Sequence, residues 1–390
     1  MEQPALRRAA LPPFAGRQKE EGAYMKLTGI RLAEVNVPLV TPFKTALRTV
    51  NSVNDIVIAV ETDTGAEGYG EAPPTAVITG DTKGSIRCAI EDFIAPAICG
   101  MELCDEASID AIMKKMQQAI VKNTSAKAAV DMAIYDLYGK LTGKPLYRLL
   151  GGSHCRETVE TDLTISVNPV EEMVRDAQRA VAEGFRILKV KVGKEGLKDV
   201  ERMEAIRKAV GPEIKLRVDA NQGWSREEAV RVIRAMEDRA LDIDLVEQPV
   251  KAHDFEGMVM VTQAVDTKIL ADESVFSPED AERLIEAGGA DLINIKLMKT
   301  GGIHEALRIC RLAEQHHVEC MIGCMLESKI SVAAAAHLAA AEPVITRADL
   351  DGPSLCSEDP YTGGPLFEGP FIRMTDAPGL GITRVPALER

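Results

Sequence analysis

Five charged residues recur at near-even intervals in the second half of the chain, and their types could bind a metal ion and move protons. Three acids lie between two lysines, with successive gaps of 28, 28, 25 and 24 residues, at Lys191, Asp219, Glu247, Asp272 and Lys296. These gaps match one strand–loop–helix unit, and each residue closes a short strand-like segment. In a (β/α) barrel the C-terminal strand ends converge on one mouth. The spacing therefore predicts three carboxylates flanked by two general bases.

The three acids are predicted to bind a hard divalent cation. Neither a thiolate nor an imidazole stands beside them in the segments Asp219-Ala220-Asn221, Glu247-Gln248-Pro249 and Asp272-Glu273-Ser274. One acid at a strand end would more often be solvated or cap a helix, but three successive strand ends favour a shared ligand set. Carboxylate oxygens favour Mg²⁺ or Mn²⁺ over Zn²⁺. We therefore predict Mg²⁺ as the cofactor, with Mn²⁺ as a substitute, and Asp219, Glu247 and Asp272 as its ligands.

Three lysines are predicted to carry the proton chemistry. Lys189 and Lys191 are two residues apart, so both side chains leave their strand on the same face. Lys296 lies four strands further round and therefore faces Lys191 across the mouth. Burial, the metal and a second ammonium should lower a lysine pKa towards roughly 7–8, where the amine can act as a base. We assign Lys191 and Lys296 as the two bases, in preference to solvated lysines, because their strands are apolar. Lys189 is assigned as the electrostatic partner of Lys191 and as a candidate contact of the enolate.

Strictly alternating strand and helix patterns predict the barrel that positions these residues. Amphipathic helical patterns, for example over residues 171–183, 199–210 and 226–239, separate eight strand-like segments near 160–166, 187–192, 215–219, 244–247, 268–272, 291–296, 319–324 and 344–350. No helix is expected after the eighth strand, because residues 351–370 are rich in Gly, Pro and Ser. We predict an α/β fold in which residues 155–370 form a modified TIM barrel of the (β/α)7β type.

The residues before the barrel predict an α+β capping domain over 25–150, completed by the C-terminal tail 371–390. Its strands are expected at 30–37, 55–62 and 67–71, with a hairpin turn over 62–65, and its helices at 83–98, 107–121 and 125–141. Residues 1–24 lack periodicity and are predicted to be a flexible extension.

Composition excludes some partners. The 390 residues carry a formal charge of −14, which argues against nucleic acid and against anionic membrane surfaces. The eight cysteines form no C-x-x-C pair, and the N-terminus lacks a signal-peptide core, so we expect a cytoplasmic protein with reduced thiols. The oligomeric state stays open, and a homo-oligomer is compatible with the sequence.

The chain resembles the enolase superfamily, muconate-lactonizing subgroup, over residues from about 25 to 385. The motifs behind this resemblance are Lys189-Val190-Lys191, the three acidic segments, residues 296–302 (KLMKTGG), and residues 125–131 and 145–152. The chain is most similar to the L-Ala-D/L-Glu epimerases, which are dipeptide epimerases, through residues 41–49, 70–75, 78–81 and 349–351. The resemblance implies epimerisation of L-Ala-L-Glu to L-Ala-D-Glu by two-base 1,1-proton transfer through a metal-stabilised enediolate, in cell-wall peptide metabolism.

The same resemblance implies the substrate contacts. Asp349 and Asp351 share one side of the eighth strand end and would hold the α-ammonium of a dipeptide, although a second metal site or a turn feature are alternatives. Arg48 would grip the glutamate side-chain carboxylate, and Phe43 and Ile78 would line the same pocket. The alternative functions are a dipeptide epimerase of other specificity, an N-acylamino acid racemase, a cycloisomerase, or a non-catalytic binding relative.

Overall fold

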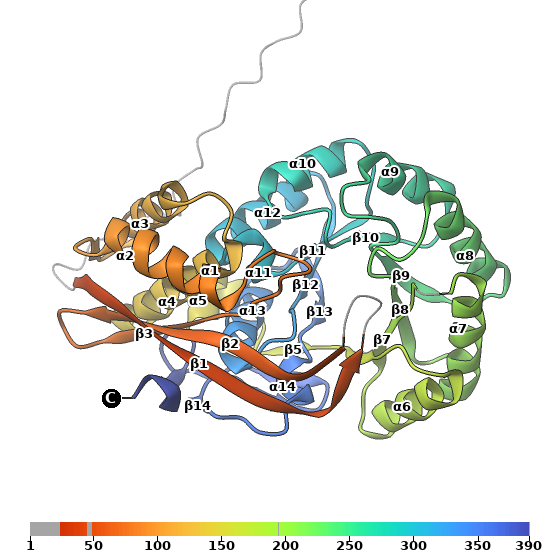
Figure 1. Cartoon of the computed structure of the whole chain (residues 1–390), viewed down its shortest axis with the longest axis horizontal. Coiled ribbons are helices and arrows are strands. Elements are labelled where there is room, and N and C mark those ends of the chain that lie inside the picture. The colour runs from red at the N-terminus through yellow and green to blue at the C-terminus, as the bar shows by residue number, and fades with distance from the viewer. Residues whose placement is uncertain (1–23, 45–48, 194, 390) are drawn as a thin grey trace, which may run out of the picture.

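The second half of the chain contains an eight-stranded parallel sheet (Figure 1). The structure, a computed structural model, describes residues 24–44, 49–193 and 195–389. Neighbouring strands follow one another in chain order: β6 (Leu163–Ile165), β7 (Ile187–Lys191), β8 (Lys215–Asp219), β9 (Ile243–Glu247), β10 (Ile269–Ala271), β11 (Leu292–Ile295), β12 (Glu319–Gly323) and β13 (Ile345–Asp349). A four-residue helix, α14 (Gly352–Leu355), stands where an eighth full helix would follow β13. The predicted (β/α)7β barrel is therefore confirmed.

Helices surround the barrel (Figure 1), and their buried residues are mainly apolar. They are α6 (Val170–Ala182), α7 (Leu197–Val210), α8 (Arg226–Asp238), α9 (Phe255–Ala264), α10 (Pro278–Glu286), α11 (Leu297–Thr300), α12 (Ile303–Gln315) and α13 (Lys329–Ala341). Three begin at a side chain that accepts a hydrogen bond from a backbone N–H of the first turn, namely Ser225, Asp254 and Ser277. In the part of the chain that the structure describes, no helix combines the length and the apolar character needed to cross a bilayer.

The expected first strand, 160–166, is divided in two. Its beginning lies in β5 (Thr158–Glu160), which pairs antiparallel with β16 (Phe371–Arg373), and β16 pairs with β15 (Leu366–Glu368). Only its end, β6, joins the barrel. The division arises because the C-terminal tail supplies a competing strand partner, which local periodicity cannot reveal. Hydrogen bonds of side chains and backbone connect the two edges of the barrel. One of them runs from Leu350 N to Thr161 Oγ1 at 2.7 Å.

A separate four-stranded sheet precedes the barrel, in the order β3-β2-β1-β4. It comprises β1 (Met25–Lys44), β2 (Thr49–Thr62), β3 (Glu67–Ala72) and β4 (Glu102–Leu103), so β1 and β2 are longer than predicted. The helices are α1 (Lys83–Cys88), a π-helical turn (Ala89–Ile94), α2 (Ala95–Ile98), α3 (Glu106–Ala119), α4 (Thr124–Thr142) and α5 (Leu146–Gly151). Helix α4 crosses β3 so closely that a Cβ at Gly70 would lie 1.9 Å from Ala129 O. Because Gly70 has no side chain, helix α4 and strand β3 can pack this closely.

Two buried acids of the predicted capping domain form hydrogen bonds with helices of the barrel. Glu71 on β3 accepts hydrogen bonds from Ser328 N and Ser331 N, both at 2.9 Å, and so caps α13 from outside. Asp131 on α4 accepts bonds from the backbone N–H groups of Ile303 and His304 and caps α12 in the same way. These bonds join β3 to α13 and α4 to α12.

The C-terminal tail returns to the first part of the chain. Leu380 N donates to Asp136 on α4 at 2.8 Å, and Gly379 forms a bridge with Pro145. Strand β17 (Ile382–Arg384) pairs with β14 (Thr362–Gly363). The domain boundaries themselves, 25–150 and 155–370, stay predictions. The prediction of a flexible extension falls on residues 1–24, of which 1–23 lie outside the described residues.

Inside the barrel, an apolar cluster lies next to the acids at the strand ends. Leu245, Leu270, Leu292 and Met321 form a buried apolar layer of their own. Two residues further along β9 is Glu247, and two further along from Leu270 is Asp272. Because alternate strand residues face the same side, the strands that build this layer also aim the acids into the mouth.

Candidate active site

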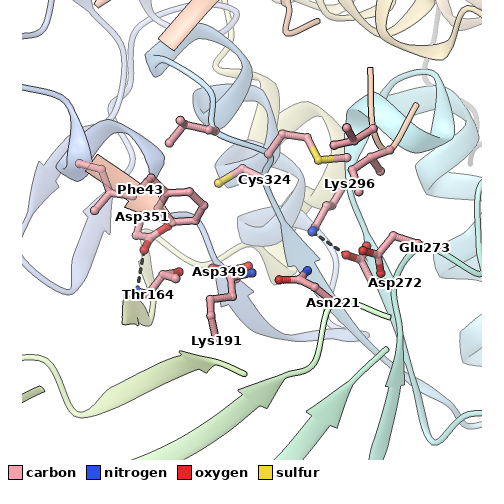
Figure 2. A pocket seen from close by; sticks show the side chains of 15 residues that line it. Phe43, Thr164, Lys191, Asn221, Asp272, Glu273, Lys296, Cys324, Asp349 and Asp351 are labelled. Atoms are coloured by element: carbon pink, nitrogen blue, oxygen red, sulfur yellow. Dashed lines mark hydrogen bonds and ion pairs between the residues drawn. The ribbon is translucent and has the colours of Figure 1, made fainter. Parts of the chain in front are cut away.

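The strand ends bring the predicted residues to one mouth. Strand register pairs Lys191 with Asp219 and Asp219 with Glu247, across β7, β8 and β9. Asp272 directly follows β10, and Lys296 directly follows β11. Figure 2 shows Lys191, Asp272 and Lys296 around one pocket, and Lys191 and Lys296 enter it from strands that lie four positions apart in the barrel. The sequence spacing therefore corresponds to a real convergence of side chains.

Strand β12 ends in a glycine, so it places no side chain in the mouth of the barrel. Gly323 ends β12, between the strands that carry Lys296 and Asp349. A Cβ at Gly323 would lie 2.9 Å from Lys296 Cε and 2.9 Å from Asn294 Oδ1, which is closer than real Cβ atoms approach. The glycine therefore leaves room for the Lys296 amine at the centre of the mouth.

The Lys189 ammonium lies among three carboxylates. Its Nζ is 2.7 Å from Glu247 Oε2, 2.7 Å from Asp349 Oδ2 and 3.2 Å from Asp219 Oδ2. Burial opposes the charged amine, but the carboxylates of Asp349, Glu247 and Asp219 outweigh it and raise the pKa of Lys189 well above its usual range. Lys189 thus places a positive charge beside these acids, and its role as an electrostatic partner stays a prediction.

The two lysines assigned as bases each face one acid. Lys191 Nζ donates to Asp219 Oδ2 at 2.6 Å, and Lys296 Nζ donates to Asp272 Oδ2 at 2.7 Å. Burial favours the neutral amine of Lys296, but the charge of Asp272 outweighs burial and raises the pKa of Lys296. The direction is opposite to the lowered lysine pKa that we expected, because in this arrangement the lysines themselves neutralise the acids.

The same charges divide the acids into two groups. Burial would raise the pKa of all three, but Lys191 and Lys189 hold the pKa of Asp219 below its usual range, and Lys296 and Lys299 do the same for Asp272. For Glu247, burial and the neighbouring charge of Asp219 prevail and raise the pKa to about 7. The site therefore holds several carboxylates close together, and nearby positive charges are needed to stabilise their negative charge.

By donor type the acids fit a hard cation, although lysine side chains lie between them. Within residues 24–44, 49–193 and 195–389, no three His, Cys, Asp or Glu side chains surround one cation-sized point. The Lys189 ammonium already places a positive charge between Asp219 and Glu247. Further buried oxygens near these acids accept no hydrogen bond, on Asn221, Glu273 and Asn294. The donors are all oxygen and buried, which fits Mg²⁺.

The predicted substrate residues lie at the same pocket, which has a cavity volume of about 60 Å³ and opens to solvent. Phe43, Ile78, Asp349 and Asp351 all line it. Asp351 Oδ2 accepts a hydrogen bond from Thr164 N at 2.7 Å, and burial together with the Asp349 charge raises the pKa of Asp351 to about 6. Arg48 lies outside the described residues, so its predicted place over the mouth stays a prediction.

Several residues of the pocket had no predicted role. Lys299 Nζ lies 2.7 Å from Asp272 Oδ1 and also donates to backbone carbonyls, so it helps to hold that acid in place. Glu273 lines the pocket, and burial with the charge of Asp272 raises its pKa to about 8. Lys299 and Glu273 both belong to motifs quoted above, but nothing in the sequence sets them apart from the other residues of those motifs. Only their burial next to Asp272 in the structure does so. Asn221 and Cys324 also line the pocket without a predicted role.

Fold and site together define a member of the enolase superfamily, and sequence comparison agrees. Residues 27–151 match the mandelate racemase/muconate lactonizing enzyme N-terminal domain, and residues 172–387 match the enolase C-terminal domain-like family. The chain belongs to this mandelate racemase/muconate lactonizing enzyme family, as its motifs predicted.

Several relatives within the family are epimerases. The chain is 55% identical to the L-Ala-D/L-Glu epimerase of Clostridium acetobutylicum, over 92% of this chain and 99% of that protein. A substrate-liganded complex of the Bacillus subtilis L-Ala-D/L-Glu epimerase has a TM-score of 0.89 at 49% identity, over 92% and 99% of the two chains. The Enterococcus faecalis dipeptide epimerase, complexed with Mg and L-Leu-L-Tyr, has a TM-score of 0.88 at 44% identity, over 92% and 100%.

Proposed function

We propose that the chain is a Mg²⁺-dependent epimerase that interconverts L-Ala-L-Glu and L-Ala-D-Glu. The observation that carries the proposal is the approach of Lys191 and Lys296 to one pocket from strands four positions apart, with buried carboxylates beside each amine. Identities of 55% and 50% to two L-Ala-D/L-Glu epimerases, over nearly the whole chain, support the reaction and the substrate.

The metal would be held by Asp219, Glu247 and Asp272, with Mn²⁺ as a substitute for Mg²⁺. When bound, the metal supplies positive charge that stabilises the negative charge developing on the substrate carboxylate. Lys189 contacts Asp219 and Glu247 and adds a second fixed positive charge to the same region. The Mg-containing complex of the Enterococcus faecalis relative supports this cofactor.

Lys191 and Lys296 would exchange the proton at the glutamate α-carbon. One neutral amine removes the α-proton from one face, and the ammonium on the other side returns a proton to the opposite face. Because the two amines approach a planar carbon from opposite sides, each turnover inverts that centre. Asp272 raises the pKa of Lys296, so sharing the Asp272 charge with a metal would lower that pKa and favour the neutral base.

The dipeptide would be held at both ends. Asp349 and Asp351 would bind its α-ammonium, since both carboxylates are buried and line the pocket. Phe43 and Ile78 would pack against the substrate, and Arg48 would pair with the glutamate side-chain carboxylate. Such a dipeptide derives from bacterial cell-wall peptide, and its recycling would place the protein in the cytoplasm.

Proton NMR of L-Ala-L-Glu in D₂O with Mg²⁺ tests the proposal. The glutamate α-proton signal should disappear while L-Ala-D-Glu accumulates. With Lys191→Ala, only one epimer should exchange its α-proton, without inversion, and with Lys296→Ala only the other epimer should do so. Lys198→Ala, which removes an exposed lysine paired with Glu195, is the control and should behave like the unchanged protein. Exchange of the same epimer in both variants would contradict the two-base assignment.

A second substrate class is favoured by the pocket wall. Cys324, Met325, Leu326 and Leu355 give it apolar surface, and the Enterococcus faecalis relative binds L-Leu-L-Tyr. A panel of dipeptides and N-acylamino acids in the same NMR assay separates these cases. Faster exchange with apolar dipeptides than with L-Ala-L-Glu would replace the glutamate assignment, and exchange of N-acylamino acids alone would indicate a racemase.

A further inference from the structure

Glu273 is a buried acid whose carboxylate has no hydrogen-bond partner. It directly follows Asp272, is 5% exposed, and lines the pocket. Neither of its carboxylate oxygens accepts a hydrogen bond within the described part of the chain. Figure 2 shows the Glu273 carboxylate next to Asp272, on the Lys296 side of the pocket. Burying an acid without a partner costs free energy, so this side chain needs a reason to be there.

The backbone around Glu273 is held firmly. Gln248 Oε1 accepts hydrogen bonds from Asp272 N at 3.0 Å and from Ser274 N at 3.1 Å. Lys299 Nζ donates to the carbonyl of Val275 at 3.1 Å and also to the carbonyl of Asp272. The fold thus fixes both neighbours of Glu273 and leaves its two oxygens facing the pocket, as for an acceptor prepared for a bound group.

A second unpartnered oxygen belongs to Asn221, which lines the same pocket. Asn221 is 7% exposed and its Oδ1 accepts no hydrogen bond. Its backbone is strained, with φ of +43°, and its N–H donates to Asp219 Oδ1 at 2.8 Å. Glu273 and Asn221 therefore each follow a predicted metal ligand, just beyond the ends of β10 and β8, and each offers a free acceptor.

We propose that Glu273, with Asn221, accepts the hydrogen bonds of a water bound to the metal, and is a positioning residue of the metal site. The inference rests on the proposed function, because it takes Asp219, Glu247 and Asp272 as ligands. Mg²⁺ prefers six oxygen ligands and usually keeps waters. Three carboxylates leave further positions for substrate and water, and a metal-bound water needs acceptors for its two protons. Acceptors of this kind orient the ligands and strengthen metal binding.

Titration of the metal-stripped full chain with Mn²⁺, followed by the EPR signal of the free ion, tests the inference without activity. Glu273→Gln should weaken Mn²⁺ binding about 10–100-fold. Its metal-free Tm should equal or exceed that of the unchanged protein, because the substitution removes an acid that is buried unfavourably, without a hydrogen-bond partner. Glu327→Gln is the matched control: Glu327 is also a buried acid near the mouth, but Met325 N donates to it at 2.5 Å, and it does not line the pocket. It should bind Mn²⁺ within twofold of the unchanged protein.

Asp219→Asn separates failure of this inference from failure of the proposed function. Loss of Mn²⁺ binding in Asp219→Asn, with unchanged binding in Glu273→Gln, would overturn the inference and leave the proposed metal site standing. Unchanged binding in Asp219→Asn would overturn both. A lower metal-free Tm in Glu273→Gln would show that the side chain supports the fold, and would also overturn the inference.

Discussion

Replacing Lys189 by methionine should destabilise the metal-free protein by about 3–5 kcal/mol, because the change leaves buried acids without their partner. Lys189 is 1% exposed, and its ammonium lies within 3.2 Å of Asp219, Glu247 and Asp349. Methionine has nearly the same shape, so the loss should come from charge and not from a cavity. Restoring positive charge should therefore recover part of the stability.

Mg²⁺ provides that charge, and its effect can be worked out. At a concentration of 100 times Kd, a bound ligand stabilises a folded protein by about 2.7 kcal/mol. In Lys189→Met the metal no longer competes with an ammonium for Asp219 and Glu247, so its Kd should fall. A tenfold fall adds about 1.4 kcal/mol. The stability difference between the two proteins should therefore shrink in Mg²⁺, to about 2–4 kcal/mol.

Chemical denaturation of both proteins, with EDTA and with Mg²⁺, measures this difference. Lys127→Met is the control, because Lys127 is also buried but donates to the neutral Gln117 Oε1 at 2.9 Å. Its cost should be smaller and independent of Mg²⁺. A loss below about 1 kcal/mol in metal-free Lys189→Met, or a difference that Mg²⁺ leaves unchanged, would refute the reasoning, since a buried unpaired charge costs several times more.

Three further changes test other parts of the structure. Asp351→Asn should raise KM for a dipeptide about 10–100-fold with little loss of kcat, since a hydrogen bond to a charged group contributes about 1.5–3 kcal/mol; a fall in kcat alone would contradict a role in binding. Glu71→Gln should cost about 1–3 kcal/mol, because its amide cannot accept from both Ser328 N and Ser331 N, and an unchanged Tm would show that the cap on α13 is dispensable. Burial lowers the pKa of His337 to about 4, whereas an unfolded histidine titrates near 6.5. Between these values the unfolded chain binds a proton that the folded protein does not, so stability should fall by about 3 kcal/mol as pH drops from 6.5 to 4. His337→Asn should remove this fall in stability below pH 6.5 and leave the pH dependence of stability above pH 6.5 unchanged. Parallel Tm–pH profiles of the two proteins would exclude His337 as the source of the fall.

Local patterns predicted much of the fold and of the candidate site. A two-residue period places Lys189 and Lys191 on one face, and the spacing of strand ends orders Lys191, Asp219, Glu247, Asp272 and Lys296 around the mouth. The structure brings these side chains to one pocket region, as expected. Such features depend on chain periodicity and on barrel geometry, both of which can be inferred from sequence alone.

Strand pairing over long distances escaped the same reasoning. The segment 160–166 has one continuous pattern, but β5 pairs with β16, more than 200 residues away, and only β6 enters the barrel. Strands β1 and β2 also run beyond their predicted ends, because their pairing continues as far as Lys44 and Thr49. A competing partner decides where a strand ends, and a local window does not contain it.

By itself, then, the sequence determined which residue types reach the mouth and in what order. Only the tertiary structure decided which amine pairs with which acid, that Lys189 contacts three carboxylates, and that Glu273 is buried without a partner. It also decided that Glu71, from the first sheet, caps a barrel helix. Periodicity sets the direction of a side chain, but its partners and its solvent exposure depend on segments that meet only when the chain has folded.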